Sequence, residues 1–301
     1  MTARISFDKA SGKYVGFMGN KKVVTSKYKT AVEKRIAELG GNVDFEAAEA
    51  QAAKRDAKFG INTRFEFVEK LVNMVAAGVQ PSAVITGEGG LGKTYTVTKT
   101  LEKNGFKDIS DLAEFQVGAL INTRKCFTMV KGYSTAKGLY RTLFENNKSI
   151  IVFDDCDAVL KDPVALNLLK GALDSYGKRI ISWNADMRDD DLPRSFNFEG
   201  RVIFISNMTQ DSIDQAIRSR SMLIDLSMNA DQKIERMETI AKCDSFMPEY
   251  DVAIKNDALA LIRTLKNEAK EISLRTLISV CKIRASNPKD YKDLAEYMMV
   301  A

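Results

Sequence analysis

The chain has 301 residues, 45% of them hydrophobic. No apolar stretch reaches the roughly 20 residues that a membrane span needs, so we expect no membrane-spanning helix. The absence of histidine excludes Ser-His-Asp and Cys-His triads and any metal centre built on imidazole. Because the four cysteines occur singly and the first residues lack the apolar core of a secretory signal, the sequence predicts a cytoplasmic protein without a disulfide framework.

The net charge of +5 is unevenly distributed along the chain. Residues 1–40 contain nine Lys and Arg and three acidic residues, which is a net charge of +6. Such a segment suits contact with the phosphate backbone of a nucleic acid. An ordinary lysine-rich face of a small domain explains the same pattern, and the sequence leaves both interpretations open.

The N-terminal part has the pattern of a small β-sheet domain. Residues 3–25 form three short runs broken by the turn-forming segments ASGK and GNKK, which predicts a three-stranded antiparallel meander. A helix is expected over residues 26–41, which end in two glycines. This arrangement resembles the small β-sheet DNA-binding domains of phage-type integrases. We predict a basic N-terminal domain over residues 1–41 and an alanine-rich connecting helix over residues 42–58.

From residue 82 onward, short apolar runs alternate with helical segments, as in a parallel sheet covered by helices on both faces. The expected strands are residues 83–86, 127–130, 150–153, 202–206 and 222–226, with helices between them, for example over residues 93–104 and 136–146. After residue 229 the pattern changes to four helices without strands. The predicted fold class is therefore α/β. A three-layer α/β/α core covers residues 59–228, and a helical domain, the lid, covers residues 229–301.

The segment GEGGLGKT carries the strongest chemical signal, because it follows an expected strand and opens an expected helix. In such a P-loop, glycines let backbone N–H groups converge on phosphate oxygens beside the positive end of a helix. Lys93 adds a mobile positive charge, and the Thr94 hydroxyl suits Mg²⁺. The residues predicted to bind ATP are Gly87, Glu88, Gly89, Gly90, Leu91, Gly92, Lys93, Thr94 and Tyr95.

A second motif consists of the buried strand at residues 150–153 and the acidic residues that follow it. Its carboxylates are expected to emerge beside the P-loop. We predict that Asp154 holds Mg²⁺ through its water shell and that Asp155 orients and activates the attacking water. Asp157 is a third carboxylate in reach of the same region.

Together these motifs resemble those of the AAA+ ATPases over roughly residues 55–300. Most of that family carries glutamate where this chain has Asp155, which puts the reach of its carboxylate to the water in doubt. The resemblance implies that Asn207 is the sensor-1 residue beside the attacking water. The segment IRSRS resembles the Ser-Arg-Cys motif of clamp loaders, so Arg220, with Arg218 in second place, is implied to reach the ATP of a neighbouring subunit.

The resemblance also implies two contacts further from the reacting atoms. Arg275, in the segment SLRT that opens a helix of the lid, is similar to sensor 2, which touches phosphate. The adenine is expected near Gly60 and Ile61, upstream of the P-loop.

Two segments bear on the substrate. In residues 179–201, two apolar runs flank an acidic, proline-containing turn, and an inserted hairpin or a single edge strand with a loop explains them equally well. Protein unfoldases carry an aromatic–hydrophobic–glycine loop after the second strand, for which Tyr133 and Tyr140 are the nearest aromatic candidates. Because residues 130–145 pass almost directly into a helix, the sequence does not support threading of a polypeptide.

The sequence thus predicts an ATPase that converts ATP and water to ADP and phosphate with Mg²⁺. An arginine that acts across an interface implies a homo-oligomer, a hexamer-like ring or a spiral, in which hydrolysis moves the lid against the core. The basic first forty residues and the clamp-loader-like arginines favour DNA or a DNA-bound complex as the substrate that is remodelled. A protein-remodelling chaperone and an ATP-gated scaffold with little hydrolysis are the alternatives. The compact chain with one ATPase module resembles small phage-encoded AAA+ proteins.

Overall fold

The computed structural model describes residues 2–8, 13–18, 21–39, 42–43, 58–110, 125–132, 134–184 and 192–301. The chain divides into two compact units, Met1–Gly60 and Ile61–Ala301. The connecting helix predicted for residues 42–58 falls almost wholly on residues 44–57, outside the described residues. The four-part division of the chain therefore stays a prediction.

The smaller unit is a sheet with one helix against it. Its strands are β1 (Thr2–Asp8), β2 (Lys13–Met18), β3 (Lys21–Ser26) and the short β4 (Asn42–Val43), and its helix is α1 (Lys29–Glu38). The antiparallel pairs β1–β2 and β2–β3 confirm the predicted meander. The sequence analysis missed β4, which pairs parallel with β1, because two residues show no periodicity.

Gly16 shows why this helix packs closely on the sheet. A Cβ atom at Gly16 would lie 2.6–2.8 Å from side-chain carbons of Val24, Val32 and Ile36. Val32 and Ile36 come from α1, and both are fully buried. The missing side chain at Gly16 therefore makes room for the helix.

The larger unit is built on a parallel sheet with the strand order β12-β5-β11-β8-β7-β6 in the described part of the chain. These strands are β5 (Ser82–Thr86), β6 (Lys107–Asp108), β7 (Cys126–Lys131), β8 (Ile150–Asp154), β11 (Arg201–Ser206) and β12 (Met222–Asp225). All five predicted strands are confirmed to within one residue at each end. The sixth, β6, was missed because it consists of two exposed residues.

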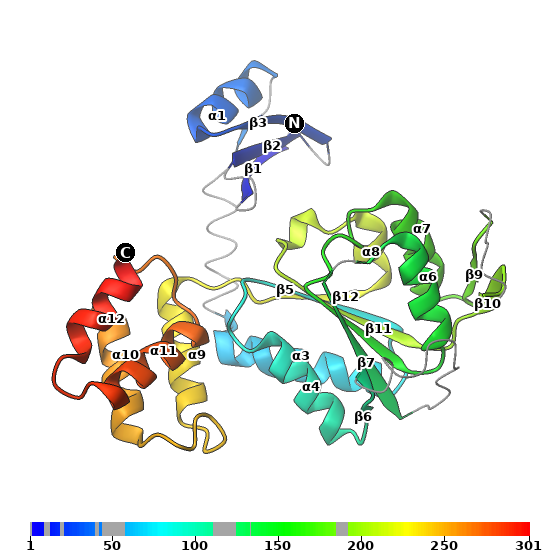
Figure 1. Ribbon diagram of the computed structural model, residues 1–301. Coiled ribbons are helices and arrows are strands. Elements are labelled where there is room, and N and C mark those ends of the chain that lie inside the picture. The colour runs from blue at the N-terminus through cyan, green and yellow to red at the C-terminus, as the bar shows by residue number, and fades with distance from the viewer. Residues whose placement is uncertain are drawn as a thin grey trace. The chain divides into compact units, whose positions relative to one another are not determined.

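Helices cover both faces of this sheet (Figure 1). One face packs against α3 (Ile61–Ala76) and α4 (Lys93–Lys103), and the other against α6 (Ala136–Glu145), α7 (Pro163–Ala172) and α8 (Gln215–Arg220). Along β8, Ile150 and Val152 face the first set of helices, whereas Ile151 and Phe153 face the second. The strand is apolar throughout because both of its faces are buried. The predicted three-layer α/β/α core is confirmed.

Four helices follow the sheet and form the lid, as predicted: α9 (Ala230–Ala241), α10 (Val252–Thr264), α11 (Leu274–Ser286) and α12 (Tyr291–Val300). They enclose a core of their own, in which Met237, Ile262 and Val280 are fully buried. The lid also packs on the core domain. Asn62 of α3 donates to Thr239 of α9 at 3.0 Å.

Two short strands, β9 (Ile180–Ser182) and β10 (Ser195–Asn197), pair antiparallel beside α6 and α7. Of the two alternatives for residues 179–201, the structure therefore shows paired strands, although residues 185–191 lie outside the described residues. The fully buried Tyr140 packs against Trp183 and Phe196 with ring centroids 5.8 and 5.3 Å away. Tyr140 is thus a packing residue and not a loop aromatic, and Tyr133 lies outside the described residues.

A short 3₁₀ turn, η1 (Gln210–Ser212), links β11 to α8. None of the described helices is both long and apolar enough to cross a bilayer.

Candidate active site

The polar residues predicted from three separate segments meet at the carboxyl edge of the larger sheet. Strand β11 lies between β5 and β8, with Ser206 opposite Thr86 and Ile205 opposite Asp154. Because the three strands are parallel, the loop after β5, the residue after β11 and the acids after β8 all emerge on the same side.

In the loop of residues 87–94, three residues have backbone conformations that only glycine adopts easily. Gly87, Gly90 and Gly92 have φ values of 134°, 76° and 93°. A Cβ atom at Gly87 would also lie 2.9 Å from the backbone carbon of Leu226. Leu91, by contrast, is 1% exposed and anchors the loop in the core beneath it.

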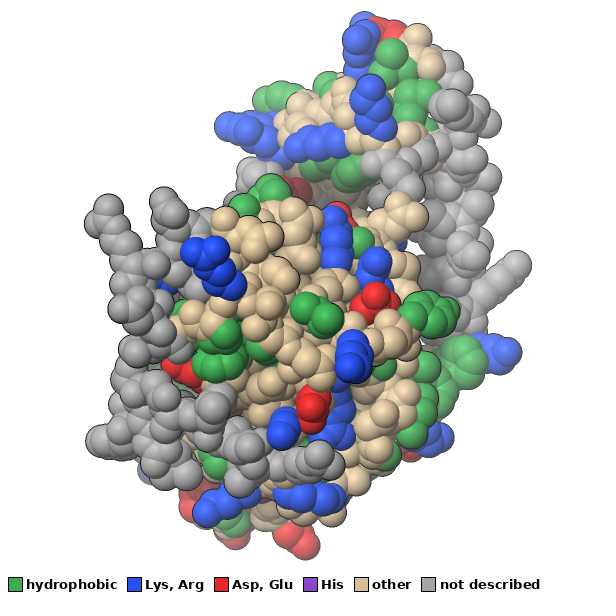
Figure 2. Space-filling model, turned by 90° about the vertical axis from the view of Figure 1, so that its right-hand side faces the viewer, with side chains coloured by type: hydrophobic (Ala, Val, Ile, Leu, Met, Phe, Trp, Pro, Cys, Tyr) green, Lys and Arg blue, Asp and Glu red, His purple; other side chains and the backbone are tan. Residues whose placement is uncertain are grey.

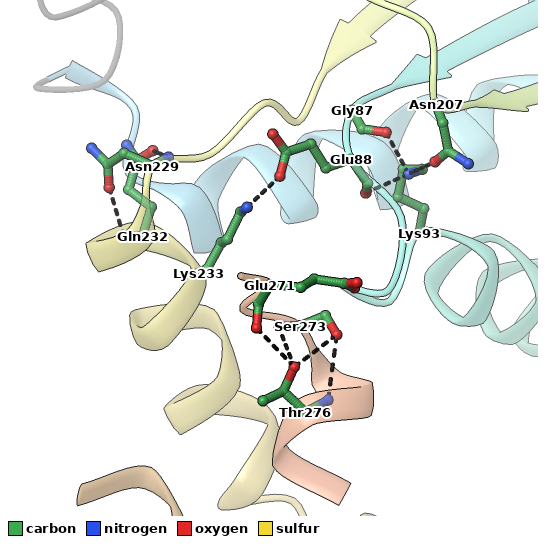
Figure 3. Close-up of polar contacts among 10 residues, drawn as sticks. All are labelled: Gly87, Glu88, Lys93, Asn207, Asn229, Gln232, Lys233, Glu271, Ser273 and Thr276. Atoms are coloured by element: carbon green, nitrogen blue, oxygen red, sulfur yellow. Dashed lines mark hydrogen bonds and ion pairs between the residues drawn. The ribbon is translucent and has the colours of Figure 1, made fainter. Parts of the chain in front are cut away.

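Lys93 lies at the centre of the site with its amine held by three oxygens (Figure 3). Its Nζ atom donates to the carbonyl oxygens of Gly87 and Glu88, both at 2.7 Å, and to Oδ1 of Asn207 at 3.0 Å. Burial lowers the pKa of Lys93, and the nearby carboxylates, first Asp155, oppose that shift. The three acceptors of this ammonium are uncharged oxygens. Negatively charged phosphate oxygens form stronger hydrogen bonds with it and can therefore take their place.

Thr94 and Asp154 offer oxygen ligands side by side. The Thr94 hydroxyl donates to Oδ1 of Asp154 at 3.0 Å, and Nζ of Lys131 lies 3.7 Å from the other carboxylate oxygen. Among the described residues, no three His, Cys, Asp or Glu side chains cluster to hold a metal unaided. A hydroxyl beside one carboxylate fits Mg²⁺, which keeps several waters and uses phosphate oxygens as further ligands.

Asn207 connects Lys93 to Asp155. Its Oδ1 accepts from Lys93, and its Nδ2 donates to Oδ1 of Asp155 at 2.7 Å. Asp155 has a positive φ of 57°, and its N–H donates to the Ile205 carbonyl at 3.0 Å. Asp157 is held elsewhere, because its carboxylate accepts from the Ser206 hydroxyl at 2.6 Å.

The lid touches the loop at two points, and Figure 3 shows one of them, the pair of Glu88 and Lys233. The first amide of α11, at Leu274, donates to the Gly90 carbonyl at 2.8 Å, and Lys233 of α9 forms an ion pair with the side chain of Glu88. Arg275, which follows Leu274, is exposed at the start of α11.

The remaining predicted binding residues are further from this network. Tyr95 is 57% exposed on α4, and its ring lies 6.0 Å from Nζ of Lys99. Ile61 is fully buried in the core with α3, whereas Gly60 is exposed. The structure thus keeps the Ile61 side chain in the hydrophobic core.

Arg218 and Arg220 belong to α8, whose last residue lies beside the amino end of β5. The Arg220 carbonyl accepts from the hydroxyl of Ser82, the first residue of β5, whereas the loop follows the last residue of that strand. The Arg220 guanidinium donates to the Ala216 carbonyl at 3.1 Å, and that of Arg218 lies 3.8 Å from Asp211. The structure therefore does not bring either arginine to the loop of its own chain.

The sequence did not single out Lys131 or Lys233, and it singled out Ser273 only within the segment SLRT, not for its contact with Gly90. Lys131 ends β7, so its place at a strand end was a usable signal. Lys233 is 145 residues from Glu88, and Ser273 meets the loop only because α11 is folded back on it. No local pattern marks those two contacts.

Known proteins that are similar to this chain include ATPases, as the glycine-rich loop and the acidic residues after β8 predict. Residues 83–229 match the model of the ATPase family associated with various cellular activities (AAA). A 36.7 kDa protein of Enterobacteria phage T4, encoded in the nrdC-mobD intergenic region, is 26% identical over 265 residues, which are 82% of this chain and 77% of that protein. These similarities confirm the resemblance to AAA+ ATPases and to a phage protein.

Among solved structures, the chain is similar to one from work on the structural basis for katanin self-assembly. The identity is 15%, and the TM-score is 0.34. The match covers 69% of this chain and 58% of that one.

Proposed function

We propose that the chain binds ATP in the loop of residues 87–94 and hydrolyses it to ADP and phosphate, because residues 83–229 match the model of the AAA ATPase family. Loop amides and Lys93 bind the phosphates, and Asp155 accepts a proton from the attacking water. Asn207 forms hydrogen bonds with both the Asp155 carboxylate and the Lys93 amine and so links them. Thr94 and Asp154 would hold Mg²⁺, which would neutralise charge on the phosphates when bound.

A single observation carries this proposal. Three polar contacts converge at one sheet edge, between segments that follow the strands β5, β8 and β11. Lys93 contacts Asn207, Thr94 contacts Asp154, and Asn207 contacts Asp155, all within hydrogen-bond distance. A structural role alone does not require a buried lysine held by two carbonyls of a glycine-rich loop, since a hydrophobic residue would fill that space at lower cost.

The experiment is nucleotide binding and phosphate release with Mg²⁺ present, in the wild type and in Lys93→Met. We expect K93M to weaken ATP binding by about 30-fold or more, because a charge-assisted hydrogen bond is lost. Lys99→Met on the same helix is the control, since Lys99 pairs with Glu102 on the surface. ATP binding that is equal in the wild type and K93M would refute the proposed site. ATP binding without phosphate release would favour an ATP-gated scaffold.

We further propose that ATP is hydrolysed between subunits of a homo-oligomer. The place of Arg220 supports this, because its backbone lies at the amino end of β5 and its guanidinium contacts Ala216, not the loop of its own chain. The subunit count is testable from the mass of the complex with ATP bound.

For the substrate, we propose DNA or a DNA-bound complex, contacted by the smaller unit. Lys21, Lys22 and Lys27 are exposed on β3 and just after it, and Tyr28 beside them is 72% exposed. In Figure 2, Lys and Arg side chains outnumber acidic ones on the visible face of this unit. Exposed ammonium groups bind phosphates, and an exposed ring offers a surface for stacking a base.

Filter binding of DNA across a salt series tests this assignment, with ATP turnover measured in parallel with and without DNA. Lys22→Glu should weaken binding and reduce its salt dependence, whereas Lys34→Glu, on α1 of the same unit, should do neither. Absence of DNA binding at low salt, or affinity that does not fall as salt rises, would refute the assignment. ATP-dependent retention of one protein, without stimulation by DNA, would instead favour the chaperone alternative.

A further inference from the structure

Glu88 places an acidic side chain in a loop that is proposed to receive a triphosphate. Its carboxylate does not point toward Lys93. In Figure 3 it extends to the other side of the loop, toward the lid, where it pairs with Lys233 of α9. The Glu88 side chain is 35% exposed and that of Lys233 is 16% exposed, so both are partly shielded from water.

A carboxylate at this position opposes the binding of an anion. Coulomb repulsion between charges near a protein surface is strong enough over a few ångströms to change an affinity by about tenfold. A lysine against the carboxylate cancels its field and keeps it turned away from the phosphates. The pairing with Lys233 therefore offsets the opposing charge of Glu88 in the loop.

The structure of helix α9 holds Lys233 in position to pair with Glu88. Helix α9 begins with a capping box in which Asn229 and Gln232 bond each other's backbone at 2.9 and 3.0 Å. Its neighbouring acids have other partners, since Asp231 pairs with Lys266 and Glu235 accepts from Asn62. Lys233, in the first turns of α9, is thus directed at Glu88.

We propose that Lys233 is a positioning residue for ATP, which acts from the lid by neutralising Glu88 and holding it away from the phosphate site. This inference rests on the proposed ATP binding and assigns a lid residue to it. The lid then contributes to nucleotide affinity by neutralising the charge of Glu88. This contribution is separate from the backbone hydrogen bond between Leu274 and Gly90.

The test is a double-mutant cycle on the full chain, with titration of a fluorescent ATP analogue in the presence of Mg²⁺. Lys233→Met should weaken binding about tenfold, because it removes the ammonium that pairs with Glu88. E88Q should bind more tightly than the wild type, because it removes the carboxylate that opposes the phosphates and leaves the Lys233 ammonium. The double variant E88Q/K233M should return to within about twofold of the wild type, since the net charge of the pair is zero in both.

If the pair of Glu88 and Lys233 only fixes the lid against the loop, the four affinities should follow a different pattern. Glu88→Gln and Lys233→Met would then weaken binding equally, and their combination would not restore it. The ratio of ATP to ADP affinity gives a second readout, because a charge effect falls more heavily on ATP. Lys266→Met, which removes another lysine paired with α9, is the control and should change neither affinity nor this ratio.

The outcomes separate this inference from the proposed function. Wild-type protein without ATP affinity overturns both. Wild-type affinity with an unchanged K233M, or a double variant as weak as K233M, overturns the role of Lys233 alone. Restored affinity in the double variant also shows that the loss in K233M did not come from misfolding.

Discussion

At the residue scale, the backbone of Asp155 explains a departure from the AAA+ pattern. Its φ of 57° lies in the left-handed region, where aspartate and asparagine are tolerated better than residues with longer side chains. Asn207 fixes its carboxylate from one side. A shorter acid at this position is therefore compatible with the local turn, whereas a glutamate would have to adopt a strained backbone.

We predict that Asp155→Asn leaves folding stability within about 0.5 kcal/mol of the wild type, because asparagine tolerates the same φ. Phosphate release should fall by at least about 100-fold, since the amide cannot accept a proton from water. ATP binding should persist. Chemical denaturation, nucleotide titration and a phosphate assay measure the three effects, and hydrolysis by D155N near the wild-type rate would contradict the role of Asp155.

The cysteines differ in their environments. Burial, followed by the charge of Asp154, raises the pKa of Cys156 to about 11, and burial raises the pKa of Cys281 to about 11. The thiolate is the reactive form, so a raised pKa makes a thiol less reactive at any pH below it. Cys243 is exposed on the lid.

We predict that iodoacetamide at pH 8 labels Cys243 well before Cys156 and Cys281. A rise of about two units from the ordinary thiol pKa lowers the thiolate fraction at that pH by about 100-fold. Peptide mass spectrometry after timed labelling measures the order, and labelling in denaturant, where all sites become equivalent, is the control. Equal labelling rates in the native protein would show that Cys156 is not shielded as described.

At the element scale, the start of helix α11 docks on the loop through Gly90. The φ of Gly90 is 76°, and a Cβ atom there would lie 3.0 Å from Cβ of Ser273, the residue that caps α11. The neighbouring Gly89 has no such restriction, because its nearest contact is the Asn207 amide oxygen at 3.5 Å. Two adjacent glycines thus face different constraints.

We predict that Gly90→Ala destabilises the protein by about 2 kcal/mol, through backbone strain and displacement of Ser273. Gly89→Ala should cost about 0.5 kcal/mol or less. Denaturant unfolding without nucleotide measures both, which keeps effects on ATP binding out of the comparison. Equal stabilities of the two variants would mean that α11 is not held at Gly90.

At the scale of the whole molecule, the loop of residues 87–94 and Arg220 lie apart within one chain. The loop and its acids lie at the carboxyl edge of the sheet, whereas Arg220 lies near Ser82 at the amino end of β5. A site that needs both is complete only when a second chain brings its arginine to the first.

We predict that Arg220→Ala and Asp155→Asn, each inactive alone, regain ATP hydrolysis when mixed. Random assembly of equal amounts leaves about a quarter of the interfaces with an intact loop facing an intact arginine. A phosphate assay on the mixture measures this. A mixture of D155N and K93M is the control and should stay inactive, because it contains no chain with an intact loop. No recovery in assembled R220A/D155N mixtures would contradict hydrolysis between subunits.

The sequence by itself determined the features that neighbouring residues encode. Continuous apolar runs of three or four residues predicted β5, β8 and β11 of the larger sheet, because both faces of those strands are buried. The glycine-rich loop was predicted because its residues lie together between a strand and a helix. The four helices of the lid followed from their periodicity.

The tertiary structure alone decided which of these features meet. Asn207 reaches Lys93 across 114 residues, and Lys233 reaches Glu88 across 145, because strand order and the packing of α9 on α3 bring them together. The same strand order separates Arg220 from the loop of its own chain. Periodicity and turn chemistry act over a few residues, whereas these contacts depend on how whole elements pack. The short strands β4 and β6 were missed for the same reason, since pairing with a neighbouring strand defines them.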